Sequence, residues 1–264
     1  MQPISRYRRE LGFAWHHALG FRSKIVLLMQ TIRFHARKYM PNTNETFEFN
    51  FGLTHGNVIL NLRPFSGDLF VFYEVMMDCC YEIPDSVVRN PKTILDCGGN
   101  VGLSATYLAD RYPNAIIYTV EPDAANFALL RKNTQNNPRI LPIRAAIVGS
   151  PQATVTFSTK REAWGNFITN DGSGESVPSL TIDEIAANNQ INRIDLLKMD
   201  IEGGEIDVFR LPDFLNKVGA LTIELHDSQF AMTFPSLLEK YNMCVRSKSD
   251  DGLMIVATKH DQQG

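Results

Sequence analysis

The stretch "TILDCGGNVGLSATYLADRYPNAIIYTVEPD", residues Thr93–Asp123, decides the fold. An apolar run ends in a glycine-rich turn, a helical pattern follows, and a second apolar run ends at Glu121. This order is typical of a βαβ unit, in which a helix joins two parallel strands. Ligands of such sheets bind beyond the carboxyl ends of the strands. The turn and Glu121 therefore predict a ligand site.

The same alternation continues after Asp123. Helical patterns cover 123–137 and 179–189, and apolar strand patterns cover 140–149, 193–200 and 219–227. The ending "YNMCVRSKSDDGLMIVATK" predicts two strands around an Asp-Gly turn, which would add an antiparallel edge strand. We therefore expect an α/β fold with a doubly wound, mostly parallel sheet.

The segment before Thr93 has a different pattern. We expect a helix over 15–38, a β-hairpin over 46–64 and a helix over 67–82. Polar residues with a proline separate the first helix from the hairpin, so we predict two parts. Residues 1–45 would form a helical N-terminal arm or lid, and residues 46–264 would form the α/β domain.

Charge is unevenly distributed over the 264 residues. Residues 1–40 hold eight Lys and Arg against Glu10, a net +7, so the remainder carries −10. The basic arm could lie on an anionic membrane surface, contact a partner, cover a site, or be a solvated appendage. The acidic remainder argues against a nucleic-acid partner.

The composition of the chain indicates the cellular compartment in which the protein works. The run Ile25–Met29 is far too short to span a bilayer, and no small-residue cleavage site follows it. The four cysteines form neither a CxxC pair nor a disulfide framework. These features predict a cytoplasmic protein.

The turn has the spacing D-x-G-x-N-x-G, from Asp96 through Gly98 and Asn100 to Gly102. A dinucleotide turn would have a glycine directly after the strand, where this chain has Asp96. A carboxylate there repels a pyrophosphate but attracts an ammonium or sulfonium group. Glu121, at the next strand end, can accept hydrogen bonds from ribose hydroxyls. The two acids together indicate S-adenosylmethionine, with Asp96 supporting either the turn or the amino-acid end of the cofactor.

The chain resembles the FkbM-type S-adenosylmethionine-dependent methyltransferases. The resemblance rests on "LDCGGNVG", "VEPDAANFALLRKN", "LKMDIEGGE" and "IELH", with "RPFSGDLFVFYEV" upstream. It implies a seven-stranded, Rossmann-like class I methyltransferase fold and O-methylation of a small hydroxylated acceptor, such as a sugar, glycolipid or secondary metabolite. The expected cofactor-binding residues are Asp96, Gly98, Gly99, Asn100, Gly102, Glu121, Pro122, Ala146 and Asp200.

Polar residues interrupt two apolar strands near their carboxyl ends, where core packing does not explain them. Since a hydroxyl is a poor nucleophile, a base must accept its proton during methyl transfer. We expect His226 to be this base, with Asp200 or Glu224 orienting it or replacing it. The predicted catalytic residues are Lys198, Asp200, Glu202, Glu224 and His226.

Four alternatives stay open at this point. The Lys–carboxylate network could only tie two strands together. No metal is expected, but Asp200, Glu224 and Asp227 could hold Mg²⁺ in a metal-dependent sugar O-methyltransferase. The chain could also be a nucleic-acid methyltransferase, although it has no N-P-P-[YF] motif, or a non-catalytic cofactor-binding protein.

Overall fold

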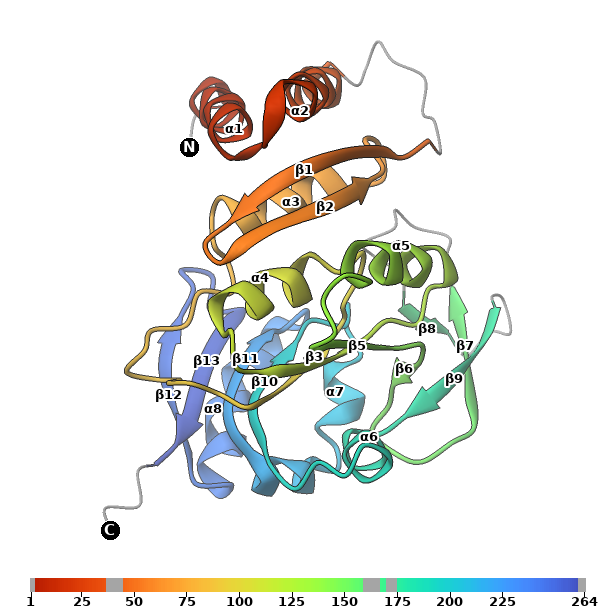
Figure 1. Ribbon diagram of the computed structural model, residues 1–264. Helices are drawn as coiled ribbons and strands as arrows, with labels where there is room; N and C mark the ends of the chain where they lie inside the picture. Colours follow the sequence, from red (N-terminus) through yellow and green to blue (C-terminus); the bar gives the residue numbers. More distant parts are fainter. Residues whose placement is uncertain (1–2, 37–44, 159–166, 170–174, 261–264) are drawn as a thin grey trace.

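A computed structural model describes residues 3–36, 45–158, 167–169 and 175–260 of the chain. Its centre is a seven-stranded sheet (Figure 1). All neighbouring strands are parallel except at β13, which pairs antiparallel with β11 and with the edge strand β12. This confirms the predicted doubly wound, mostly parallel sheet and its antiparallel edge. The strand order is β12 (Met243–Lys248), β13 (Met254–Lys259), β11 (Val218–Glu224), β10 (Ile194–Met199), β3 (Thr93–Cys97), β4 (Ile116–Val120) and β5 (Ile140–Ile143).

Helices cover both faces of this sheet (Figure 1). One face carries α4 (Leu103–Arg111) and α5 (Ala124–Thr134), and the other carries α6 (Ile182–Asn188), α7 (Glu205–Val208) and α8 (Ser228–Lys240). Successive strand residues point to opposite faces. Ile94 therefore belongs to the core under α4, whereas Leu95 belongs to the core on the other side.

The predicted hairpin is also confirmed. It consists of β1 (Phe47–Leu53) and β2 (Gly56–Leu62), paired from Phe47 with Leu62 to Leu53 with Gly56. Phe47, Phe49 and Phe51 alternate along β1 and are all buried. These rings pack against α3 (Asp68–Met76) in a third apolar cluster.

The helix expected over 15–38 is wrong in its bounds. The structure has two helices instead, α1 (Pro3–His17) and α2 (Gly20–His35). The break occurs because Ala18 forms a β-bridge with Phe51, and Gly20 has a φ of +77° that favours glycine. Ala14, Ala18 and Leu27 are fully buried in the cluster around the hairpin. The boundary at residue 45 stays a prediction, but these helices share a core with the β1–β2 hairpin.

Other boundaries differ from the patterns. The strand expected over 140–149 divides into β5 and β6 (Ala146–Ile147). Strand β6 leaves the central sheet to pair with β9 (Glu175–Leu180), which in turn pairs with β7 (Thr154–Ser158), the neighbour of β8 (Phe167–Thr169). The helix expected from Ser179 begins only at Ile182, after the Thr181 cap, because the preceding residues complete β9.

Three further elements differ from the sequence patterns or add to them. Helix α3 ends at Met76, earlier than expected, and a 3₁₀ helix covers Pro212–Lys217. Helix α8 is an addition to the predicted elements, and Pro235, a residue that usually ends helices, lies inside it. Most of the polar stretch 160–176 lies outside the described residues. In the part of the chain that the structure describes, no helix is long and apolar enough to cross a membrane.

Candidate active site

The glycine turn between β3 and α4 is shaped by close packing against neighbouring strand ends. Gly98 has a φ of +87°, and a Cβ there would lie 1.7 Å from the carbonyl oxygen of Asp200. A Cβ on Gly99 would lie 2.2 Å from Oγ1 of Thr119. Gly102, with a φ of +89°, then begins α4. The first two glycines are therefore required by the protein's own backbone and side chains.

A buried ion pair lies beneath the turn. Nζ of Lys198 is 3.2 Å from Oδ1 of Asp96 and donates a 2.8 Å hydrogen bond to the carbonyl oxygen of Gly98. The other Asp96 oxygen accepts hydrogen bonds from the hydroxyls of Ser104 and Thr119. Burial lowers the pKa of Lys198, but the Asp96 and Asp200 carboxylates outweigh it and raise the pKa overall. Of the two roles left open for Asp96, this geometry favours support of the turn.

Glu121 fixes the other side of the turn. Its Oε2 accepts a 2.9 Å hydrogen bond from the backbone N–H of Asn100, and its Oε1 accepts one from the N–H of Asp123. Only 6% of the residue is exposed, and burial raises the pKa of its carboxyl group to about 8. Glu121 therefore connects the end of β4 to the turn after β3.

One cavity of about 440 Å³ extends from the turn to the ends of β10 and β11. This volume is within the range of small-molecule sites. The cavity brings together four of the predicted cofactor-binding residues and all five predicted catalytic residues. Its walls are formed by Phe70, Val71, Glu74, Val75, Cys80, Tyr81, Gly98, Gly99, Asn100, Leu103, Ser104, Lys198, Asp200, Glu202, Glu224, His226 and Met254.

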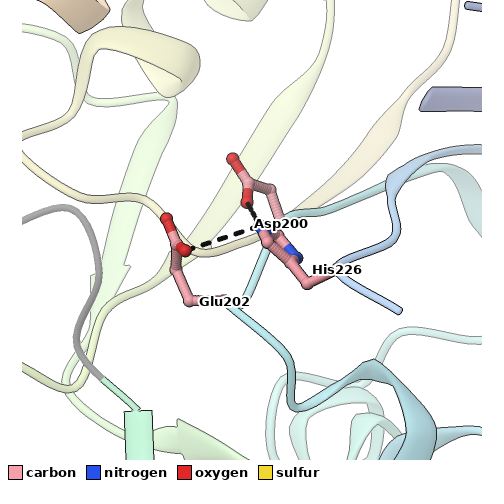
Figure 2. A group of neighbouring side chains, drawn as sticks. All are labelled: Asp200, Glu202 and His226. Atoms are coloured by element: carbon pink, nitrogen blue, oxygen red, sulfur yellow. Dashed lines mark ion pairs between the residues drawn. The ribbon is translucent and has the colours of Figure 1, made fainter. Parts of the chain in front are cut away.

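A histidine–carboxylate cluster occupies the end of this cavity (Figure 2). Nε2 of His226 lies 3.4 Å from Oε2 of Glu202 and 3.8 Å from Oδ1 of Asp200. Its Nδ1 lies 3.0 Å from Oε1 of Glu205, a buried carboxylate that also accepts hydrogen bonds from the turn after β10. Glu202 has a φ of +56°, a strained conformation that is common at functional sites.

The pKa values of His226 and Glu202 in the cluster are both raised above the ordinary values of these side chains. The hydrogen bond to Glu205 raises the pKa of His226 to about 9, against the effect of burial. Burial, assisted by the Asp200 carboxylate, raises the pKa of Glu202 to about 7. Near neutral pH His226 is therefore protonated and cannot accept another proton, whereas a carboxylate beside it can.

Six predicted residues are not part of the cavity wall: Asp96, Gly102, Glu121, Pro122, Ala146 and Asp227. Asp227 caps α8, where its Oδ1 accepts a hydrogen bond from the N–H of Phe230. Ala146 is buried in β6, and Pro122 follows Glu121 after β4. The metal set suggested by the sequence is therefore replaced by another one. Single ligand atoms of Asp200, Glu202 and His226 lie within 4.8 Å of one another and could hold a metal ion.

Sequence reasoning missed three residues of the site, one of which is Glu74 on the cavity wall. The hydroxyl of Tyr81 donates a 2.9 Å hydrogen bond to Oδ2 of Asp200, and nothing in the sequence pattern around Tyr81 marks it. Glu205 positions His226 through its contact with Nδ1. The sequence could have indicated Glu205, because this residue ends the same "DIEGGE" motif from which Glu202 was predicted.

The geometry fits S-adenosylmethionine. Oδ1 of Asn100 and Oδ1 of Asp200 are buried without a hydrogen-bond partner among the described residues, and both residues line the cavity. Such acceptors suit the ammonium group of the cofactor and a donor on the acceptor substrate. Glu121, next to the turn, retains lone pairs for ribose hydroxyls. Asn100, Glu121 and the backbone of the turn would hold the cofactor.

The strand order and this site together define a class I S-adenosylmethionine-dependent methyltransferase. A family model, the methyltransferase FkbM domain, matches residues 96–244. The chain belongs to the FkbM methyltransferase family.

Two known proteins with similar sequences carry the name methyltransferase. Methyltransferase 1 of Beauveria bassiana is 26% identical over 211 residues, which cover 69% of this chain and 83% of that protein. The hexuronic acid methyltransferase AglP of Haloferax volcanii is 23% identical over 135 residues, which cover 50% of this chain and 54% of that protein. Among solved structures, Methanococcus jannaschii fibrillarin is 12% identical with a TM-score of 0.45, and the match covers 82% of this chain and 99% of that one.

Proposed function

We propose that the protein transfers the methyl group of S-adenosylmethionine to a hydroxyl of a small acceptor, such as a sugar, a glycolipid or a secondary metabolite. The observation that carries this proposal is the single cavity joining the glycine turn to the histidine–carboxylate cluster. The bound cofactor supplies an electrophilic methyl group. An acceptor in the same cavity would be held close to that group, and positioning is a large part of such catalysis.

The protein's own residues would manage the proton of the acceptor hydroxyl. Oδ1 of Asp200 is the strongest candidate to receive it, because this atom is buried, lies 3.8 Å from Nε2 of His226 and has no hydrogen-bond partner among the described residues. Tyr81 holds the other oxygen of the same carboxylate in place. His226, held in the cluster by Glu205, would compensate the negative charge instead of acting as the base.

A polar, hydroxylated acceptor fits the walls of the cavity. Glu74, Asp200, Glu202 and Glu224 place four carboxyl groups around it, and these can accept hydrogen bonds from several hydroxyls. The similarity to a hexuronic acid methyltransferase supports a sugar-like acceptor. The same carboxyl groups would repel a nucleic-acid backbone, which disfavours the nucleic-acid alternative.

The test is an acceptor screen with methyl-labelled cofactor over sugars, uronic acids, glycolipids and hydroxylated metabolites. Asp200→Asn should lower the rate by about 10²–10⁴-fold while cofactor binding is retained, because only the base is lost. His226→Ala should lower the rate less if the histidine only compensates charge. Glu239→Gln, on the far end of α8, is the control and should keep the full rate. Full activity in Asp200→Asn would contradict the assigned base, and the absence of turnover on every acceptor would favour a binding protein.

A metal-dependent reaction is a second candidate, favoured by the convergence of Asp200, Glu202 and His226 (Figure 2). A divalent cation there could bind the acceptor oxygen and promote loss of its proton. It predicts that a chelator abolishes turnover and that Mg²⁺ restores it, with Glu202→Gln also inactive. Turnover that is unchanged after chelation and dialysis would eliminate this candidate.

A further inference from the structure

Helix α2 is apolar on two opposite faces. Leu27 and Thr31 are fully buried on the face toward the hairpin. Phe21, Met29 and Ile32 lie on the opposite side and are 75%, 55% and 48% exposed. A surface helix normally has a polar outer face. The outer face of α2 is therefore built to contact something apolar.

The exposed surface continues around the corner between the two N-terminal helices. Trp15 and Leu19 are 43% and 39% exposed there, and Nζ of Lys24 lies 4.9 Å from the centre of the Trp15 ring. Both helices lie at one end of the molecule, beyond the hairpin (Figure 1). A flat surface could therefore approach them without meeting the α/β core.

Cationic side chains border this apolar face. Helix α2 contains Arg22, Lys24 and Arg33 but no Asp or Glu. Helix geometry places Arg22 and Arg33 along one side of the exposed apolar residues and Lys24 along the other. A second copy of the chain would bring these cations toward one another across a twofold contact, which is unfavourable. An anionic surface with an apolar interior satisfies both features.

We infer that the outer face of α2 binds an anionic lipid surface. The helix would lie in the headgroup region with Phe21, Met29 and Ile32 inserted toward the acyl chains, and the basic residues would contact lipid phosphates. This mode needs no membrane-spanning helix. It also gives a role to the basic residues of α2, whereas Arg6 and Arg9 of α1 pair with Glu10 and Asp78.

Sedimentation with vesicles tests this inference on the full chain. Binding should be strong with vesicles of phosphatidylcholine and phosphatidylglycerol, weak with phosphatidylcholine alone, and reduced by salt. The triple variant Phe21→Ser, Met29→Ser, Ile32→Ser should lose at least tenfold in binding, and Arg22→Gln should lose about fivefold. The control Leu211→Ser, Met232→Ser removes side chains that are 60% and 82% exposed elsewhere and should bind as the wild type does.

Two outcomes would overturn the inference. One is equal binding of the wild-type protein and the triple variant to anionic vesicles. The other is a wild-type dimer in light scattering that the triple variant converts to a monomer, with no vesicle binding by either protein. In the second case the face is a contact between copies of the chain. Cofactor binding should be unchanged in every variant, which shows that each one is folded.

Discussion

Gly98→Ala is the substitution for which the structure gives the sharpest expectation. The new Cβ would be placed 1.7 Å from the carbonyl oxygen and 2.8 Å from the carbonyl carbon of Asp200. Both contacts are below the 3.0 Å that real Cβ atoms almost never cross, and both are with backbone, which cannot rotate away. The ends of β3 and β10 must therefore separate. Because Asp200 is the assigned base, the same movement displaces the reacting group.

The expected loss of folding stability in Gly98→Ala has two parts, one from backbone conformation and one from steric overlap. A non-glycine residue at a φ of +87° costs about 1–2 kcal/mol, and forcing atoms into a packed site costs about 1–3 kcal/mol more. The free energy of unfolding from urea denaturation should therefore fall by about 2–5 kcal/mol. A displacement of Asp200 by about 1 Å should lower turnover by about 10²-fold. Calorimetry with S-adenosylhomocysteine should show weaker binding.

Gly252→Ala separates the two parts. Gly252 lies in the turn before β13 with a φ of +76°, and a Cβ there would meet nothing within 4 Å. This variant should lose only the conformational part, about 1–2 kcal/mol, and keep its affinity for S-adenosylhomocysteine. The contrary result is that the two variants lose the same stability and bind S-adenosylhomocysteine with the same affinity. That result would refute the claim that close packing at Gly98 requires a glycine.

Three further predictions concern the supporting residues. Burial raises the pKa of Glu121 to about 8 from 4.5, so this group's contribution to stability is lost as the pH rises between these values. Thermal denaturation of the cofactor-free wild-type protein should show this loss. Glu121→Gln should weaken S-adenosylhomocysteine binding in calorimetry by about 1–3 kcal/mol, because an amide offers one acceptor oxygen where the carboxylate uses two. Lys198→Met should destabilise the fold by about 3–5 kcal/mol in urea, because it leaves Asp96 buried without its cation. Adding Asp96→Asn should recover part of that loss, and additive losses would contradict the ion-pair assignment. Deletion of residues 1–44 should lower the melting temperature and promote aggregation by exposing the Phe47, Phe49 and Phe51 face, and a stable monomer would instead show that the arm is dispensable.

The central sheet could be predicted because its signals are local. Each strand is a short apolar run that ends at a turn, and each crossover helix has its own period, so the doubly wound order follows from general rules. Departures from the pattern arise where distant residues interact. Ala18 breaks a continuous helical pattern only because Phe51 is available to bridge it, and β6 leaves the sheet only because β9 lies beside it.

The site was predictable in part for the same reason. Asp200 and Glu202 follow the end of β10 and His226 follows the end of β11, so their position at the carboxyl edge could be predicted from the strand pattern. Tyr81 reaches Asp200 from 119 positions away in the chain, a contact that no local pattern encodes. The protonation of His226 was equally hidden. An isolated histidine is a good base near neutral pH, but the partner Glu205 holds a proton on this one.

A crystal structure of the complex with S-adenosylhomocysteine is the most direct test of the central claim, that one cavity holds both the cofactor and the catalytic carboxylates. We predict that the ribose hydroxyls lie within about 3 Å of the Glu121 carboxylate and that the amino-acid end lies against Asn100. The sulfur should face the space bordered by Asp200 and Glu202. A sulfur that points away from these residues, or a ribose without contact to Glu121, would contradict the account.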